Sequence, residues 1–252
     1  MAPRRAVILL GAAATLISLG VMICIAPLPQ PQAYHAFADQ RVLAGIPRVG
    51  DVLSNVGFLV VGLWCLWTLH ARRRSLQARQ VWLTPYLVFG AGLTAVAFGS
   101  TYYHWAPRNE ALFWDRLPMS VAFMALLASF VASRISVRAG KFSLWPLVVL
   151  GVGTVVYWRV TDDLRPYFLM QGLLAMLIVT MGALLPPRDG LSGRHLYALA
   201  GFYVAAVVLE QLDKFVWTLL GATVSGHSLK HVVAAVACAA VVLHIRKISE
   251  AS

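Results

Sequence analysis

The sequence has little charge, few acidic residues and few cysteines. Only 12% of its 252 residues are charged, and Asp and Glu together number 10 against 21 Lys and Arg. A soluble domain carries about 25% charged residues, so the composition argues against a soluble protein. The three cysteines, Cys24, Cys65 and Cys238, lie in apolar stretches. Their odd number and apolar setting argue against a disulfide framework, and we expect buried, unreactive thiols.

Long apolar runs take the place of the missing charge. Hydrophobic residues make up 60% of the chain, and its mean hydropathy is +0.74. A helix needs about 20 apolar residues to cross a bilayer. Eight segments have this character: Ala6–Ala26, Asp51–Leu69, Leu83–Tyr103, Phe113–Ser133, Phe142–Trp158, Pro166–Leu185, Leu196–Leu220 and Ser228–Ile245. They predict an all-α polytopic membrane protein, in which the fifth segment is short and contains Pro146.

The first apolar segment follows Arg4 and Arg5, as the core of a signal peptide would. Such a core usually has about 7–15 residues, and this segment is longer. We therefore expect a retained transmembrane helix, with cleavage near Ala33 as the alternative. The proline-rich run Pro27–Pro31 ends the helix, since proline cannot continue the backbone hydrogen bonds. Residues 1–33 thus form an N-terminal helix and linker, and residues 34–248 form the main membrane domain.

Basic residues cluster in alternate loops and near both ends of the chain. They are Arg4 and Arg5; Arg72, Arg73, Arg74 and Arg79; Arg134, Arg138 and Lys141; Arg188 and Arg194; Arg246 and Lys247. On an eight-helix path all of them fall on one side, which the positive-inside rule makes cytoplasmic. This predicts cytoplasmic termini in a membrane such as the bacterial inner membrane, with anionic lipid headgroups as partners at that face. The net charge of +11 is then a topology signal, and no nucleic-acid partner is expected.

Polar side chains gather at the opposite, outer ends of the predicted helices. Ser100 and His104 end the third segment, Asp115 begins the fourth, and His227 and His231 begin the eighth. Residues four apart share one face of a helix, so the two histidines of the eighth segment can hold the same ion. Zinc favours imidazole nitrogen, and a catalytic zinc site has three protein ligands and a water. We predict that His104, His227 and His231 bind a metal.

Asp115 and Ser100 each admit two roles. Asp115 can be the N-cap of the fourth helix, a position that suits aspartate, with Pro118 tolerated in the first turn. It can also take a proton from a zinc-activated water, whose pKa a catalytic zinc lowers to about 7. Ser100 can donate to the oxyanion of a tetrahedral intermediate, or it can bond a neighbouring helix, as serine does in membranes.

Several other polar residues lie in the same outer region. Asp51, Ser54 and Asn55 begin the second segment. Glu210 and Asp213 lie in the outer part of the seventh segment with Lys214, where they form either a structural ion pair or a contact with a substrate headgroup. The remaining histidines, His35, His70, His195 and His244, lie on loops or at other helix ends, and we interpret them as structural.

Four motifs of the sequence resemble those of the alkaline ceramidases. They are the Ser-x-x-x-His pair at Ser100 and His104, Asp115 eleven residues later, the Asp-x-Leu-Pro-Met run at 115–119 and the Gly-His-x-x-x-His run at 226–231. The run Asp51–Asn55 is similar to the Ser-Asn motif in the family's first core helix. The family belongs to a wider superfamily of seven-helix membrane hydrolases that includes the adiponectin and progestin receptors. The resemblance extends from about Phe37 to His244 and implies a seven-transmembrane-helix core, with one additional N-terminal transmembrane helix.

The resemblance implies an intramembrane zinc amidase. His104, His227 and His231 would hold Zn²⁺, while Asp115 would activate the water and Ser100 would assist the carbonyl oxygen. The substrate would be a membrane lipid, ceramide or a related N-acyl lipid, and hydrolysis would release a fatty acid and a sphingoid base. Eukaryotic members bind calcium through acidic and aromatic residues before the first core helix. In this chain the segment has Asp39 and Asp51 but also Arg41 and Arg48, and no tryptophan, which argues against a calcium site.

Two other functions compete with hydrolysis. A receptor or sensor of the same superfamily would keep the metal for structure, but a structural zinc usually has four protein ligands. A fourth His or Cys is missing from the outer cluster of the sequence. A transporter would bind its substrate near the membrane midplane on broken helices, whereas these polar residues lie at helix ends. No feature of the sequence separates an amide from an ester substrate or indicates an oligomeric state.

Overall fold

The computed structural model describes residues 3–186 and 194–250 of the chain. Within these residues the protein is an all-α membrane protein, which confirms the predicted fold class. Five helical segments are long and apolar enough to span a membrane: Val49–Ala71, Asn109–Arg134, Val137–Thr161, Arg165–Leu184 and Gly226–Glu250. Helices α1 (Pro3–Cys24), α5 (Thr84–Trp105) and α9 (Arg194–Gln211) match the other three predicted segments. That these three also cross a membrane stays a prediction.

The first of the five spans consists of two helices, and a few short elements connect the long ones. The span divides into α2 (Val49–Leu53) and α3 (Val56–Ala71), and the other four are α6, α7, α8 and α11 in chain order. The connecting helices are η1 (Gln32–His35), α4 (Arg73–Ala78) and α10 (Asp213–Leu219). A two-residue hairpin, β1 (Val42–Leu43) paired antiparallel with β2 (Ile46–Pro47), precedes α2.

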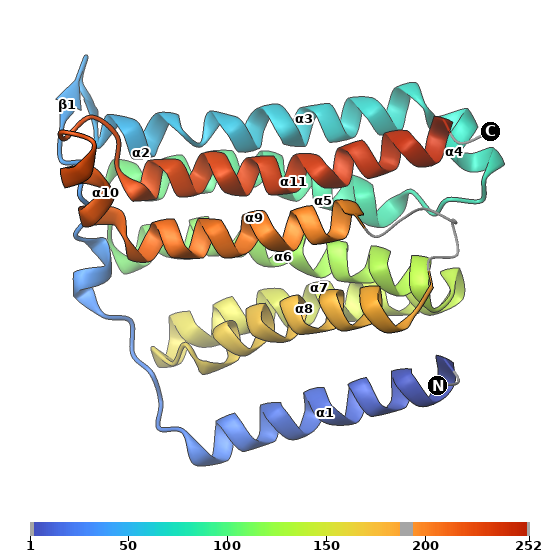
Figure 1. Cartoon of the computed structure of the whole chain (residues 1–252). Coiled ribbons are helices and arrows are strands. Elements are labelled where there is room, and N and C mark those ends of the chain that lie inside the picture. Colours follow the sequence, from blue (N-terminus) through green and yellow to red (C-terminus); the bar gives the residue numbers. More distant parts are fainter. Residues whose placement is uncertain (1–2, 187–193, 251–252) are drawn as a thin grey trace.

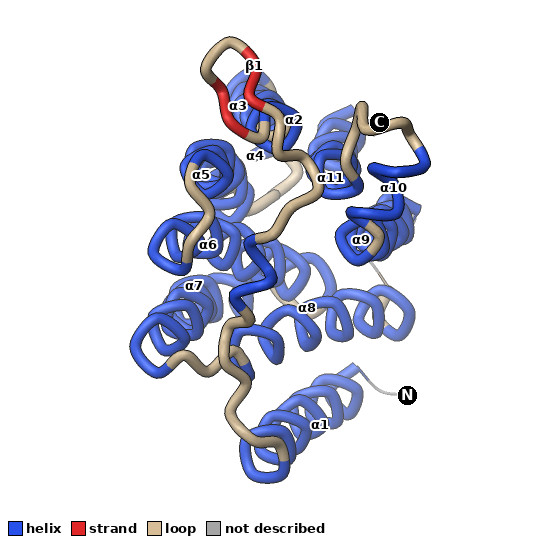
Figure 2. The backbone as a smooth tube through the Cα atoms, turned by 90° about the vertical axis from the view of Figure 1, so that its left-hand side faces the viewer, coloured by secondary structure: helices blue, strands red, loops and turns tan. Residues whose placement is uncertain are grey.

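The long helices run side by side (Figure 1), and buried hydrophobic residues form a core between them. Viewed from the end of the bundle, α3, α5, α6, α7, α8, α9 and α11 follow one another around it (Figure 2). The circuit is closed by α11, which packs against both α3 and α9. Helix α1 lies outside and packs on α8. This arrangement places the C-terminal end of α5 and the N-terminal ends of α6 and α11 around a shared interior, although they are far apart in the sequence.

Helix α7 corrects the prediction of a short fifth segment. It has 25 residues, begins at Val137 and contains Pro146 within its length. The predicted segment began only at Phe142 because Arg138 and Lys141 interrupt the apolar run. Such long basic side chains can lay their stems along apolar surface while their charged ends reach the headgroups, so the helix continues through them. Proline is tolerated in membrane helices, since neighbouring groups take up the freed carbonyl.

Both ends of the described chain lie at one end of the bundle, together with α4 (Figure 1). The β-hairpin and α10 lie at the opposite end. Two basic clusters are therefore at the same end: the arginines within residues 72–79, in and beside α4, and Arg246 with Lys247 at the end of α11. Arg188, which was predicted to share this side, lies outside the described residues. The common end fits the predicted path, and its cytoplasmic orientation stays a prediction.

We expect that cysteines at the two ends of the bundle will label from opposite sides of the membrane. Cys24 is exposed, which corrects the prediction of a buried thiol, whereas Cys65 is buried and Cys238 half-buried. With Cys24 replaced by serine, a membrane-impermeant maleimide should label Val42→Cys in intact cells, because residue 42 is 68% exposed on the hairpin. Gln77→Cys on α4 should label only after permeabilisation, because the basic end is cytoplasmic by the positive-inside rule. Labelling of Gln77→Cys alone in intact cells would reverse the topology and place the polar helix ends on the cytoplasmic face.

Candidate metal centre

Three buried histidines meet between α5 and α11. His104 is the next-to-last residue of α5, and His227 and His231 lie in the first two turns of α11. Their exposed fractions are 1%, 3% and 3%. One nitrogen of each ring lies within 4.8 Å of those of the other two. The structure thus brings the three predicted ligands together in a group that can hold a metal ion.

The donor set of this group fits zinc. The Nε2 atoms of His104 and His227 are 3.2 Å apart, close to the roughly 3.3 Å between ligands that are each about 2.0–2.1 Å from a tetrahedral zinc. Within residues 3–186 and 194–250, the group includes no fourth His, Cys, Asp or Glu. Three imidazoles and one open position are typical of a catalytic zinc, whereas a structural zinc usually has four protein ligands. Zinc is therefore the metal that we propose below.

Ser54 determines which nitrogen of His231 is free to bind a metal. Its Oγ lies 2.8 Å from Nδ1 of His231 and 3.1 Å from the carbonyl oxygen of Asp51. A hydroxyl has one proton, so donation to the carbonyl leaves Oγ to accept a hydrogen bond from Nδ1–H. The lone pair of His231 is then on Nε2. Partners of this kind orient metal-binding histidines and raise their basicity, a role that the sequence did not reveal for Ser54.

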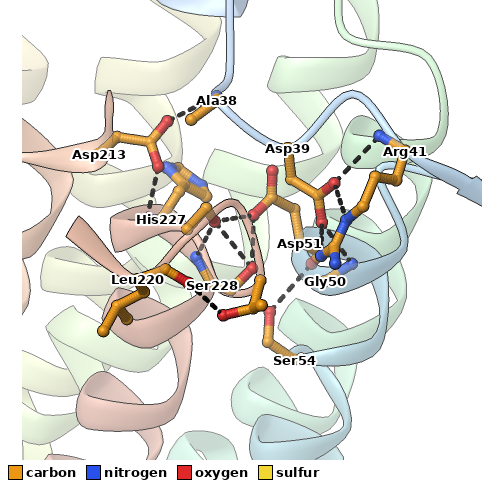
Figure 3. Close-up of polar contacts among 12 residues, drawn as sticks. Ala38, Asp39, Arg41, Gly50, Asp51, Ser54, Asp213, Leu220, His227 and Ser228 are labelled. Carbon is orange, nitrogen blue, oxygen red and sulfur yellow. Dashed lines mark hydrogen bonds and ion pairs between the residues drawn. The ribbon is translucent and has the colours of Figure 1, made fainter. Parts of the chain in front are cut away.

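Asp51 ties α2 to the start of α11. Its buried carboxylate accepts hydrogen bonds through Oδ1 from the hydroxyls of Ser225 and Ser228, at 2.8 and 2.7 Å (Figure 3). The side-chain amide of Asn55 donates to the backbone carbonyl of Asp51 at 2.9 Å, where α2 gives way to α3. Because Ser228 directly follows His227, these hydrogen bonds fix the turn of α11 that carries His227.

Asp213 holds the same turn from the other side. Its Oδ1 accepts from the backbone N–H of His227 at 2.9 Å and its Oδ2 from that of Ala38 at 2.8 Å (Figure 3). Gly226 is required for this approach, because a Cβ there would lie 2.5 Å from the carbonyl oxygen of Leu209 and 2.7 Å from Cα of Asp213. The prediction of one helix over Leu196–Leu220 is wrong at this point, since α9 ends at Gln211 and α10 begins at Asp213.

Glu210 pairs with Lys230 of α11, at 2.7 Å. The hydroxyl of Tyr34 donates to the same carboxylate at 3.0 Å. Burial, followed in importance by the charge of Glu210, raises the pKa of Tyr34 to about 12, so this hydroxyl stays protonated and remains a donor. Of the two roles that the sequence left open for Glu210, the ion pair is the one present in the structure, and its partner is Lys230.

Ser100 and Asp115 lie near each other across the contact between α5 and α6, where a Cβ added to Gly99 would lie 3.4 Å from Cα of Asp115. Gly99 allows the contact: a Cβ at this position would overlap the carbonyl oxygen of Trp114. Pro118 contributes as well, because it lacks the N–H that would otherwise bond the carbonyl of Trp114 four residues earlier. The two predicted catalytic side chains are thus adjacent. The three-histidine group does not include Asp115.

The structure excludes a helix-cap role for Asp115. Helix α6 begins at Asn109 and has Arg108 at its N-cap position, so Asp115 lies in the second turn. Pro118 lies inside the helix and was wrongly placed in its first turn. The apolar run of the sequence begins only at Ala111, after the polar Asn109 and Glu110, and hydropathy alone therefore places the helix start too late.

The segment between α1 and α2 covers the histidines with an aromatic ring. Phe37 packs on His104 and His227, with ring centroids 4.7 and 4.5 Å apart. His35 lies 2.8 Å from the hydroxyl of Tyr103 and 2.9 Å from Oδ1 of Asn109, which fits its predicted structural role. Figure 2 shows this part of the chain crossing the end of the bundle. Phe37 makes the site dry, and no local pattern in the sequence indicates its contacts.

Asp39 anchors the same segment to α2. It accepts hydrogen bonds from the Arg41 guanidinium at 2.8 Å and from the backbone N–H of Gly50 at 2.9 Å (Figure 3). Burial opposes the charged form, but the hydrogen bonds from Arg41 and Gly50 outweigh it and lower the pKa of Asp39. Asp39 and Asp51, the acidic residues considered for calcium, are each bonded to donors of the protein.

We expect Ser54→Ala to weaken metal binding by about 10–100-fold, the usual effect of removing a partner of a metal-binding histidine. His231 would lose the acceptor that holds its Nδ1–H. Affinity is measured by competition with a chromophoric chelator. Ser129→Ala is the matched control, because Ser129 is also buried and its hydroxyl bonds a backbone carbonyl of its own helix at 2.7 Å. Equal affinities of the two variants would show that Ser54 does not orient His231.

The comparisons with known proteins leave the family of the chain open. No protein-family model matches the sequence, and no curated protein matches it either. The likeness to alkaline ceramidases thus rests on the four motifs and their order. What the structure itself establishes is an all-α membrane protein whose bundle contains a buried three-histidine group that can hold a metal ion.

Proposed function

We propose that the protein is a zinc-dependent membrane hydrolase that cleaves the amide bond of ceramide or a related N-acyl lipid. The observation that carries the proposal is the buried three-histidine group, which among the described residues has no fourth His, Cys, Asp or Glu and lies at the same end of the bundle as Asp115 and Ser100. The resemblance to alkaline ceramidases points to the same chemistry.

His104, His227 and His231 would hold the zinc. When bound, zinc acts as a Lewis acid that polarises a carbonyl oxygen and makes a water reactive near neutral pH. The three rings are buried and packed by Phe37, and the exclusion of bulk water strengthens electrostatic interactions at such a site. Ser54 keeps the third ring in the orientation that presents Nε2.

Asp115 handles the proton in the proposed reaction. It accepts one proton from the attacking water while the water oxygen bonds to the carbonyl carbon. It then passes that proton to the amide nitrogen as the C–N bond breaks, so that a fatty acid and an amine leave. Ser100 donates its hydrogen bond to the carbonyl oxygen as negative charge develops there.

The position of the site suits a lipid substrate. The histidines lie within the last turn of α5 and the first two turns of α11. Helix α11 is long and apolar enough to span a membrane, and we expect α5 to span it as well. A ceramide carries its amide where the headgroup meets the acyl chains, which is the depth of helix ends. We propose the outer face of a bacterial inner membrane as the location, in line with the distribution of basic residues.

The proposal is tested by fatty-acid release from ceramide in detergent micelles. Purified protein should release a fatty acid and a sphingoid base in equal amounts, lose this activity with 1,10-phenanthroline and regain it with zinc. His70→Ala is the control for histidine removal, because His70 is exposed at the far end of α3. Protein that holds a full equivalent of zinc but hydrolyses neither ceramide nor other N-acyl lipids would contradict the proposal and favour a receptor.

A further inference from the structure

A buried arginine without a counter-ion follows Asp115 on α6. Arg116 is 4% exposed, and its Nη1 atom has no hydrogen-bond partner. Among the residues that the structure describes, the ion pairs involve other arginines and leave Arg116 out. Removing a charge from water without a partner is costly, and a charged residue in a membrane segment marks a functional site.

Neither of the two carboxylates near Arg116 forms an ion pair with it. These carboxylates belong to Asp115 and Glu210. Glu210 bonds Lys230 at 2.7 Å and Tyr34 at 3.0 Å. Asp115 takes part in none of the ion pairs of the described residues. The guanidinium of Arg116 therefore lies near two carboxylates and is bonded to neither.

Three aromatic rings surround Arg116 instead. Its Cζ lies 4.4 Å from the ring centroid of Trp158, 4.9 Å from that of Tyr167 and 5.6 Å from that of Tyr34. The rings come from α7, α8 and η1, so four separate elements form this aromatic cage. Cation–π contacts hold the guanidinium in place. They do not satisfy its N–H groups, which form a planar fork suited to the two oxygens of a carboxylate or phosphate.

The cage contains a second donor without an acceptor. The indole Nε1 of Trp158 is buried and has no hydrogen-bond partner. Arginine and tryptophan side chains can only donate, so neither can satisfy the other. Arg116 lies over the ring of Trp158, so the two unpaired donors are neighbours. A ligand with acceptor oxygens would satisfy both donors, and a negatively charged ligand would also balance the charge of Arg116.

The cage lies near the ends of three helices that are long and apolar enough to span a membrane, where we expect lipid headgroups. Arg116 is in the second turn of α6, Trp158 in the last turn of α7 and Tyr167 in the first turn of α8. We propose that Arg116 and Trp158 bind the oxyanion of a lipid, a carboxylate or a phosphate, at this position. A long-chain fatty acid, the acid product of the proposed hydrolysis, is one lipid of this class.

The test is the binding of radiolabelled palmitate to purified protein in non-ionic detergent, after the metal has been removed with a chelator. Metal-free protein is used so that a carboxylate cannot bind through the metal, and so that binding is measured whether or not the protein is a hydrolase. Arg116→Gln should weaken binding by at least about tenfold, the usual minimum loss for a charge-assisted bond. Trp158→Phe, which keeps a ring and removes the donor, should weaken it by a smaller factor.

Arg108→Gln is the matched control, because Arg108 is an exposed arginine that also lies over a tyrosine ring, that of Tyr102 at 5.8 Å. It should leave the affinity unchanged. Hexadecanol, which has the same chain length and no charge, should bind equally to the parent protein and to Arg116→Gln. Unchanged palmitate affinity in both Arg116→Gln and Trp158→Phe would overturn the proposal. So would displacement of palmitate by millimolar inorganic phosphate, since the site would then take a small free anion.

Discussion

Replacing Asp115 with asparagine is expected to leave the metal bound and to slow amide hydrolysis by about 10²–10⁴-fold, the usual contribution of a general acid–base group. Asparagine has nearly the same shape and can still bond Ser100, so the contact between α5 and α6 should persist. It cannot accept the proton of the attacking water. The three histidines do not depend on this carboxylate, because Asp115 is not part of their group.

Metal content and turnover must be measured on the same preparations, since an unfolded variant would imitate a catalytic one. Glu110→Gln is a matched control, because Glu110 is an exposed carboxylate in the first turn of the same helix and should keep full activity. Ser100→Ala should also keep the metal and lose up to about 10²–10³-fold if its hydroxyl stabilises the oxyanion. Near-normal hydrolysis by Asp115→Asn with zinc in place would remove Asp115 from the mechanism.

The helices could be predicted from the sequence because the bilayer imposes their length and composition. A run of about 20 apolar residues is a strong signal, and α3, α6, α8 and α11 lie close to their predicted positions. Hydropathy is a poor guide to helix ends. It missed the start of α7, where basic residues continue the helix, and the start of α6, where polar residues precede the apolar run.

The three histidines could be predicted because their spacing and helix positions are visible in the sequence. The residues that hold them could not. Ser54, Asp213 and Phe37 act on histidines at least 14 positions away along the chain, and such contacts depend on how the helices pack. The break between α9 and α10 follows from the same packing, since Asp213 bonds the backbone of His227. For Ser54 and Asp213 the only hint was a polar residue near the end of an apolar segment, and nothing in the sequence hinted at the role of Phe37.

His231→Ala is expected to abolish both metal binding and hydrolysis. Two remaining imidazoles hold zinc poorly. Without the metal, the proposed reaction loses the group that would make the water reactive. His231 is also the histidine that Ser54 orients, at 2.8 Å from its Nδ1. The variant should therefore lose more metal than Ser54→Ala, in which all three ligands remain. Elemental analysis after gel filtration gives the occupancy.

Thermal unfolding separates loss of the ligand from loss of the fold. A ligand that binds only the folded state at about 1,000 times its dissociation constant stabilises that state by about 4.1 kcal/mol. Added zinc should therefore raise the midpoint of thermal unfolding of the parent protein and of His70→Ala, and leave that of His231→Ala unchanged. A cooperative transition in metal-free His231→Ala, close to that of the metal-free parent protein, would show an intact fold. If His231→Ala retains full zinc occupancy and the zinc-dependent rise in the unfolding midpoint, then His231 is not a ligand, and the proposed hydrolase has no metal site of the kind described.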